Sequence, residues 1–116
     1  MPPATHGKKY FTATQANAML PLVRRIVADI TELARDMDRP DADPADGRAR
    51  LRELARELFD LGVELKDPYE GLVDFPCLMG GREVCLCWKQ GEADVAHWHE
   101  TDAGFAGRRP LKASES

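Results

Sequence analysis

The sequence predicts an α+β domain in which an antiparallel helical hairpin packs on a small three-stranded antiparallel β-meander. Three observations lead to this fold class. Apolar residues recur at helical spacing in the first third of the chain, leucines recur at helical spacing after an acidic loop, and beyond residue 71 the pattern changes to short strand-like runs. Two amphipathic helices and a small sheet each bury one face, so we expect them to stack as layers around one core.

The first helix is predicted to begin after Thr12. Thr12 and Gln15 have the spacing of a capping box, in which each side chain satisfies a backbone N–H that the first turn leaves unpaired. Pro21 lies within the helical pattern, and we expect a kink or a break there because proline removes one ladder hydrogen bond. The apolar stripe of this helix consists of Leu20, Val23, Val27, Ile30, Ala34 and Met37, and Met19, Ile26 and Leu33 widen it.

This stripe is wider than one partner helix and three strands can bury. Met19, Leu22 and Ile26 lie beside its main line. We therefore expect a homodimer that forms through the helices.

The second helix is predicted to follow a polar, proline-interrupted loop at residues 38–47. Gly62 is a candidate cap or close-packing point near the end of this helix. The apolar stripe of the helix consists of Leu51, Leu54, Leu58, Leu61 and Leu65. Because the connection is short, the two helices should be antiparallel neighbours.

Three strands are predicted in the remainder of the chain, at residues 72–75, 83–88 and 94–99. These runs are rich in apolar, β-branched and aromatic residues. Glycine pairs or single glycines at Gly80-Gly81 and Gly91 separate them, as in an antiparallel meander. The domain should span residues 11–112, with flexible tails at 1–10 and 113–116.

Composition restricts the cellular setting. The chain of 116 residues has a formal net charge of −4, which argues against a general nucleic-acid binder, because non-specific affinity depends on cations that neutralise phosphates. The longest apolar run, from Ala18 to Val23, is far shorter than a membrane span. Three cysteines, an odd number, with no export signal indicate free thiols and a cytoplasmic location, without a membrane partner.

A polar cluster is predicted from Asp74, His99 and Arg108. Each is a charged or titratable residue within apolar or glycine-rich surroundings. A buried carboxylate is tolerated only when it is paired, so we expect Asp74 to lie within hydrogen-bonding reach of His99 or Arg108.

A divalent metal such as zinc is the cofactor that the same region could bind. His97 and His99 lie at i and i+2, so they share one face of a strand and could chelate one ion. The candidate ligands are His97, His99, Cys87, Glu100 and Asp102, with Asp74, Glu83 and Glu92 as further oxygen donors.

The hairpin between the last two strands decides which of these residues meet. A three-residue loop would pair Cys85 near Val95 and place Cys85, Cys87 and both histidines on one face. A two-residue loop would pair Cys85 with Trp98 and separate them. The sequence permits both registers.

A series of short motifs runs through nearly the whole chain apart from the tails and the acidic loop. The motifs are Phe11-Thr12, Ala16-Asn17-Ala18, Leu20-Pro21, Gly62-Val63-Glu64, Lys66-Asp67-Pro68, Gly71 to Pro76, Gly81-Arg82-Glu83-Val84, Leu86-Cys87-Trp88, Gly91-Glu92, Trp98-His99, Asp102, Gly104-Phe105, Gly107-Arg108 and Pro110-Leu111. In these residues the chain resembles the DUF2203 family, a widespread prokaryotic group catalogued as a domain of unknown function. The resemblance implies no reaction that can be carried over, and Cys77, Cys85 and His97 fall outside the family pattern.

The sequence therefore leaves two functions open. The first is a small non-catalytic accessory or protein-interaction module. The alternative is a metal-binding protein or small metal-dependent enzyme, with a site around His99 and the neighbouring carboxylates.

Overall fold

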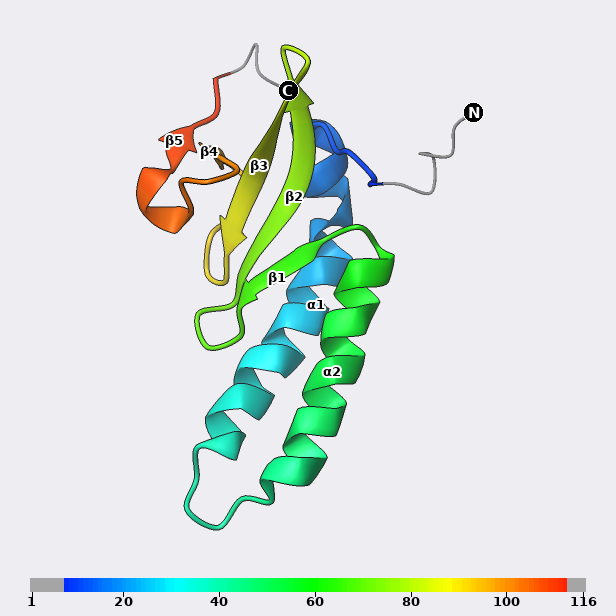
Figure 1. Ribbon diagram of the computed structural model, residues 1–116, viewed down its shortest axis with the longest axis vertical. Helices are drawn as coiled ribbons and strands as arrows, with labels where there is room; N and C mark the ends of the chain where they lie inside the picture. Colours follow the sequence, from blue (N-terminus) through cyan, green and yellow to red (C-terminus); the bar gives the residue numbers. More distant parts are fainter. Residues whose placement is uncertain (1–7, 113–116) are drawn as a thin grey trace.

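Two helices cover one face of a five-stranded antiparallel sheet in the computed structural model, which describes residues 8–112 (Figure 1). The predicted α+β class and the helical hairpin are confirmed. The predicted number of strands is wrong, because two short strands flank the predicted three. Of the predicted tails, residues 1–7 and 113–116 lie outside the described residues, whereas Lys8 and Tyr10 both contact Glu83.

Helix α1 (Ala13–Met37) starts with the predicted capping box. The Gln15 N–H donates to the Thr12 hydroxyl oxygen at 3.1 Å, and the Thr12 N–H donates to the Gln15 side chain at 3.0 Å. The helix continues through Pro21 without a break. Its apolar face, including Val23, Val27 and Ile30, is buried against both α2 and the sheet.

Helix α2 (Pro44–Asp60) ends earlier than its leucine pattern predicts. Gly62 adopts a φ of +90°, which favours glycine, and the Val63 N–H donates to the Leu58 carbonyl at 2.9 Å. The Gly62 N–H donates to the Phe59 carbonyl at 2.9 Å, which completes a Schellman motif. Leu65, predicted as the last residue of the helical stripe, consequently lies in a strand.

The sheet has the order β1-β2-β3-β4-β5, with each strand antiparallel to its neighbours. The strands are β1 (Glu64–Asp67), β2 (Leu72–Met79), β3 (Arg82–Lys89), β4 (His97–Glu100) and β5 (Arg109–Pro110). A short 3-10 helix, η2 (Phe105–Gly107), lies between β4 and β5. The predicted strands correspond to β2, β3 and β4, although β4 begins three residues later than predicted.

The register between β3 and β4 follows neither predicted alternative. Cys85 lies opposite His99, and Cys87 lies opposite His97. The connection is longer than either predicted loop because Asn17 of α1 holds it: the Val95 N–H donates to the Asn17 side-chain oxygen at 2.8 Å, and the Asn17 amide donates to the Val95 carbonyl at 3.2 Å. Residues directly opposite one another share a face, so both cysteines and both histidines lie on one side of the sheet.

The two faces of the sheet have different compositions. The face against the helices is apolar and contains Val73, Phe75, Val84, Leu86, Trp88 and Trp98. The opposite face contains Asp74, Cys85, Cys87 and His99, all buried. Gly104 and Phe105, from the segment that follows β4, lie beside Asp74 and His99. Within residues 8–112, neither helix has the length and apolar character that crossing a bilayer requires.

Candidate functional site

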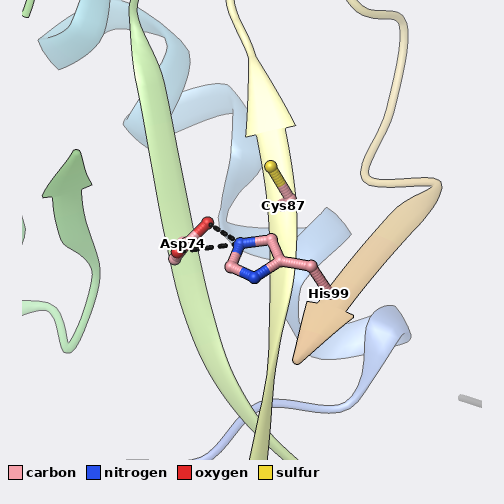
Figure 2. Close-up of side chains that lie close together, drawn as sticks. All are labelled: Asp74, Cys87 and His99. Atoms are coloured by element: carbon pink, nitrogen blue, oxygen red, sulfur yellow. Dashed lines mark hydrogen bonds and ion pairs between the residues drawn. The ribbon is translucent and has the colours of Figure 1, made fainter. Parts of the chain in front are cut away.

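Three neighbouring strands bring Asp74, Cys87 and His99 together. Asp74 on β2 lies directly opposite Cys87 on β3, and His99 on β4 lies one cross-strand row away (Figure 2). Each residue offers one potential ligand atom, and these atoms all lie within 4.8 Å of one another. The three residues are at most 3% exposed. Burial of three such polar groups at one point requires that they satisfy one another or bind something else.

The predicted contact between Asp74 and His99 is present. The imidazole Nε2 of His99 lies 3.1 Å from both carboxylate oxygens of Asp74. The imidazole Nδ1 lies 2.7 Å from the backbone carbonyl of Glu100, which can only accept a hydrogen bond. Nδ1 therefore carries a proton, and the ring is oriented with Nε2 toward Asp74.

The thiols on this face are not nucleophiles in the metal-free protein. Burial, with a further contribution from Asp74, raises the pKa of both Cys85 and Cys87 to about 12. A thiol with such a pKa is protonated at neutral pH, whereas attack requires the thiolate. Burial also raises the pKa of Cys77, which lies on the helix-facing side of the sheet. All three cysteines are free thiols, as predicted.

Arg108, predicted to join Asp74 and His99, pairs with Glu92 instead. Its Nη2 lies 2.9 and 2.7 Å from the two carboxylate oxygens of Glu92, which also accepts the Lys89 N–H at 2.8 Å. The long β3–β4 connection carries Glu92 to this position, which explains why the predicted partner is displaced. The Arg108 Nε and the His97 Nδ1 are both buried without a hydrogen-bond partner in the described part of the chain.

The other predicted metal ligands are not grouped with the three central ligand atoms, although His97 lies directly opposite Cys87. The side chain of His97 is 36% exposed, and its Nδ1 lies 4.0 Å from Glu92. Glu100 pairs with Arg82 at 2.6 Å, on the opposite face of the sheet from His99. Glu83 binds Lys8 and Tyr10, and Asp102 is exposed.

A pocket of about 150 Å³ leads to the Asp74–His99 pair. Leu72 and Phe105 give it an apolar wall, and Lys66 and Thr101 contribute polar groups. Sequence reasoning did not identify Lys66 as a site residue. The signal for it is structural: Lys66 falls at the irregularity between Leu65 and Asp67, where β1 carries one residue more than β2 can pair.

Comparison with known proteins identifies the family and adds no activity. No curated protein and no solved structure matches the chain. Residues 40–111 match the family described as an uncharacterized conserved protein (DUF2203), and this segment contains Asp74, Cys87 and His99. Because the match covers more than half of the 116 residues, the chain belongs to the DUF2203 family.

Proposed function

We propose that the protein binds a divalent transition metal of the zinc type through Asp74, Cys87 and His99. The observation that carries this proposal is the convergence of three buried ligand atoms from three strands within 4.8 Å. A thiolate, an imidazole and a carboxylate together are a donor set that zinc accepts, whereas magnesium and calcium prefer oxygen donors alone.

The distances support this proposal. Two ligand atoms bound at ~2.0–2.1 Å to a tetrahedral zinc lie about 3.3 Å apart, close to the 3.1 Å between the His99 Nε2 and the Asp74 oxygens. A zinc-bound thiolate would lie about 3.5 Å from the other two ligand atoms. The three ligand atoms lie within 4.8 Å of one another, so the cysteine sulfur would need to move inward by no more than about 1.3 Å.

The surroundings of His99 also support a metal ligand. Metal-binding histidines usually donate the other ring N–H to a carbonyl or carboxylate, which fixes the tautomer. The Glu100 carbonyl, 2.7 Å from Nδ1, accepts that hydrogen bond. Asp74 and His99 would supply oxygen and nitrogen, and Cys87 would bind as thiolate after releasing its proton to solvent. The metal would supply Lewis-acid chemistry at this position.

A buried Asp74–His99 ion pair with no metal is the competing explanation, and elemental analysis separates the two. Protein purified without a histidine tag should contain about one equivalent of zinc or a similar ion per chain. Cys87→Ser and His99→Gln should each weaken metal binding by about 100-fold or more, since loss of outer-shell partners alone costs ~10–100-fold. Sub-stoichiometric metal in every preparation would contradict the proposal.

Two matched variants serve as controls. His97→Gln removes the other histidine of the same strand, and Cys85→Ser removes the other cysteine on the same face. Both should retain metal. Equal losses in His97→Gln and His99→Gln would indicate binding at the surface rather than at the buried residues.

We place this binding protein in the prokaryotic cytoplasm. Three free thiols are typical of a reducing compartment, and the family resemblance implies a prokaryotic source.

The second candidate, a non-catalytic interaction module that forms a homodimer, is favoured by one specific observation. The side chain of Phe59 on α2 is 69% exposed, beside a groove of about 420 Å³ that also involves Val63 and Pro76. The wide apolar stripe of α1, from which the sequence predicted a dimer, gives less support to it. Ile26 is buried within the monomer and Met19 packs partly against its core, so of these residues only Leu22 is exposed.

A homodimer should have about twice the 12.9 kDa mass of the chain in light scattering at micromolar concentration. Phe59→Ser should then shift the mass toward that of the monomer. A monomeric mass for the unmodified protein would contradict the prediction.

A further inference from the structure

The proposed metal would have three protein ligands, one fewer than tetrahedral zinc takes. Structural zinc sites use four protein ligands, whereas sites with three keep one position for water or a small ligand. The described residues provide a single group of three candidate ligands here. The pocket of about 150 Å³ is lined by two of them, Asp74 and His99, so it gives solvent and small molecules access to the metal.

Lys66 places a cation at this pocket. It is the extra residue of the irregularity between β1 and β2, and such bulges redirect side chains next to functional sites. Cys87 and Asp74 are anionic ligands, so a site that holds a divalent ion has no net charge. Lys66 adds one positive charge beside it. Glu64, 3.2 Å from the Lys66 Nζ, competes for that cation but does not line the pocket.

The pocket is small, and one wall is held in place. Its volume equals that of about five water molecules at ~30 Å³ each, which suits a molecule of a few heavy atoms. The ring of Phe105 lies 4.6 Å from the Arg108 guanidinium carbon and 5.5 Å from the Lys89 Nζ, and cation–π contacts of this kind restrain an aromatic ring. Phe105 and Leu72 would therefore contact the apolar part of a ligand.

We propose that this pocket binds a small carboxylate, which takes the fourth position on the metal and pairs with Lys66. The inference rests on the proposed metal site. Water would hold the fourth position in the absence of the carboxylate, and exchange of the two neither makes nor breaks a covalent bond within the protein.

Cys85 is the residue that could make this inference wrong. It lies opposite His99 on the same face and interacts with Asp74. If Cys85 moved to become the fourth ligand, the metal would be closed to exchange. The structure instead groups only Asp74, Cys87 and His99 within ligand distance among the described residues.

Cobalt(II) makes the fourth position visible. Untagged protein loaded with Co²⁺ is titrated with acetate, and the visible d–d absorption is recorded. Acetate should change this spectrum saturably, whereas acetamide, its neutral analogue, should not. Retention of thiolate-to-cobalt absorption during the titration shows that Cys87 remains bound.

Two variants test Lys66 in opposite directions. Lys66→Met should raise the apparent Kd for acetate by about two- to fivefold, and Glu64→Gln should lower it by a similar factor, as expected for a partly exposed charge pair. Lys8→Met, which removes an exposed lysine paired with Glu83, should leave the Kd unchanged.

The outcomes separate this inference from the proposed function. Failure to bind Co²⁺ or Zn²⁺ overturns both. A bound metal whose spectrum does not respond to acetate overturns the carboxylate site alone, and so does loss of metal in Cys85→Ser, which would identify Cys85 as the fourth ligand. An acetate response that is the same in Lys66→Met and in Lys8→Met overturns the role of Lys66.

Discussion

His99 is the residue whose hydrogen bonding most restricts the chemistry of the site. Both ring nitrogens face oxygen atoms, at 2.7 Å from the Glu100 carbonyl and 3.1 Å from the Asp74 carboxylate. Without a metal, the Nε2 of His99 and the Asp74 carboxylate contact each other directly. A metal ion in that position would bind the same two groups.

Asp74→Asn distinguishes a binding site from a structural ion pair. In metal-free protein the amide can donate to the Nε2 of a neutral His99, and the cost of burying a charge disappears. We expect the free energy of unfolding to change by less than about 1 kcal/mol, or to rise, because binding sites hold groups at the expense of stability.

Urea denaturation in the presence of a chelator measures this change. A loss on the order of 3 kcal/mol would indicate that the pair exists to stabilise the fold. The same variant should bind zinc more weakly than the unmodified protein, which confirms that the substitution reached the site.

Glu92 should be more important for stability than the sequence indicates. It is the partner of Arg108, whose side chain is 12% exposed, and it accepts the Lys89 N–H as well. Glu92→Gln leaves a mostly buried guanidinium without its counter-ion, so we expect a loss of about 1–3 kcal/mol in unfolding free energy.

Glu70→Gln is the matched control for Glu92→Gln. Glu70 also pairs with a cation, Lys89 at 3.0 Å, but its side chain is 57% exposed. Glu70→Gln should lower the free energy of unfolding by no more than about 0.5 kcal/mol. Equal effects of the two substitutions in chemical denaturation would show that burial of the Arg108 pair contributes nothing.

At the scale of elements, local signals were sufficient for the start of α1 and the cap of α2 and insufficient for the sheet edges. The capping box of Thr12 and Gln15 and the glycine at 62 specify their own backbone hydrogen bonds, so they can be recognised from sequence. Strands β1 and β5 have no such local signal. They have four and two residues, and they are strands only because a neighbouring strand pairs with them.

The register of β3 and β4 could not be predicted for a related reason. The bonds that hold the connection join Asn17 and Val95, which are 78 residues apart in sequence. The contact of Asp74 with His99 was predictable, because a carboxylate within an apolar strand requires a partner. The choice of Glu92 as the partner of Arg108 depends on the path of that connection, and so it was missed.

The turn between β1 and β2 provides a test of element packing. Gly71 has a φ of +65°, and an added Cβ would lie 2.7 Å from Gln90 and 2.9 Å from Val27 of α1. We expect Gly71→Ala to lower the free energy of unfolding by about 1–3 kcal/mol for the backbone conformation and a further ~1–3 kcal/mol for overpacking.

Gly80→Ala separates these two contributions. Gly80 has nearly the same φ, +61°, but nothing lies within 4 Å of an added Cβ. Only the conformational cost should remain, and thermal denaturation of both variants measures the difference. If both variants lost the same stability, the close approach of this turn to α1 would not contribute.

At the scale of the whole molecule, the helices and the candidate site lie on opposite faces of one sheet. The helix-facing side chains form the core, and the opposite face is free to hold polar residues because the core does not depend on it. The helical hairpin extends beyond the sheet at the end that carries the connection between α1 and α2 (Figure 1). None of the residues that line the pocket belongs to either helix.

Zinc should stabilise the whole domain, because its three ligands come from three adjacent strands, β2, β3 and β4. The unfolded chain does not hold these residues together, so the metal binds the native state preferentially. Free zinc at 100 times its Kd should add about 2.7 kcal/mol, which corresponds to a rise in Tm of about 10 °C for a domain of this size. Calorimetry with and without a chelator measures the shift. His97→Gln should retain it and His99→Gln should lose it. If zinc raised the Tm of His99→Gln as much as that of the unmodified protein, zinc would bind elsewhere and would not link β2, β3 and β4 at this site.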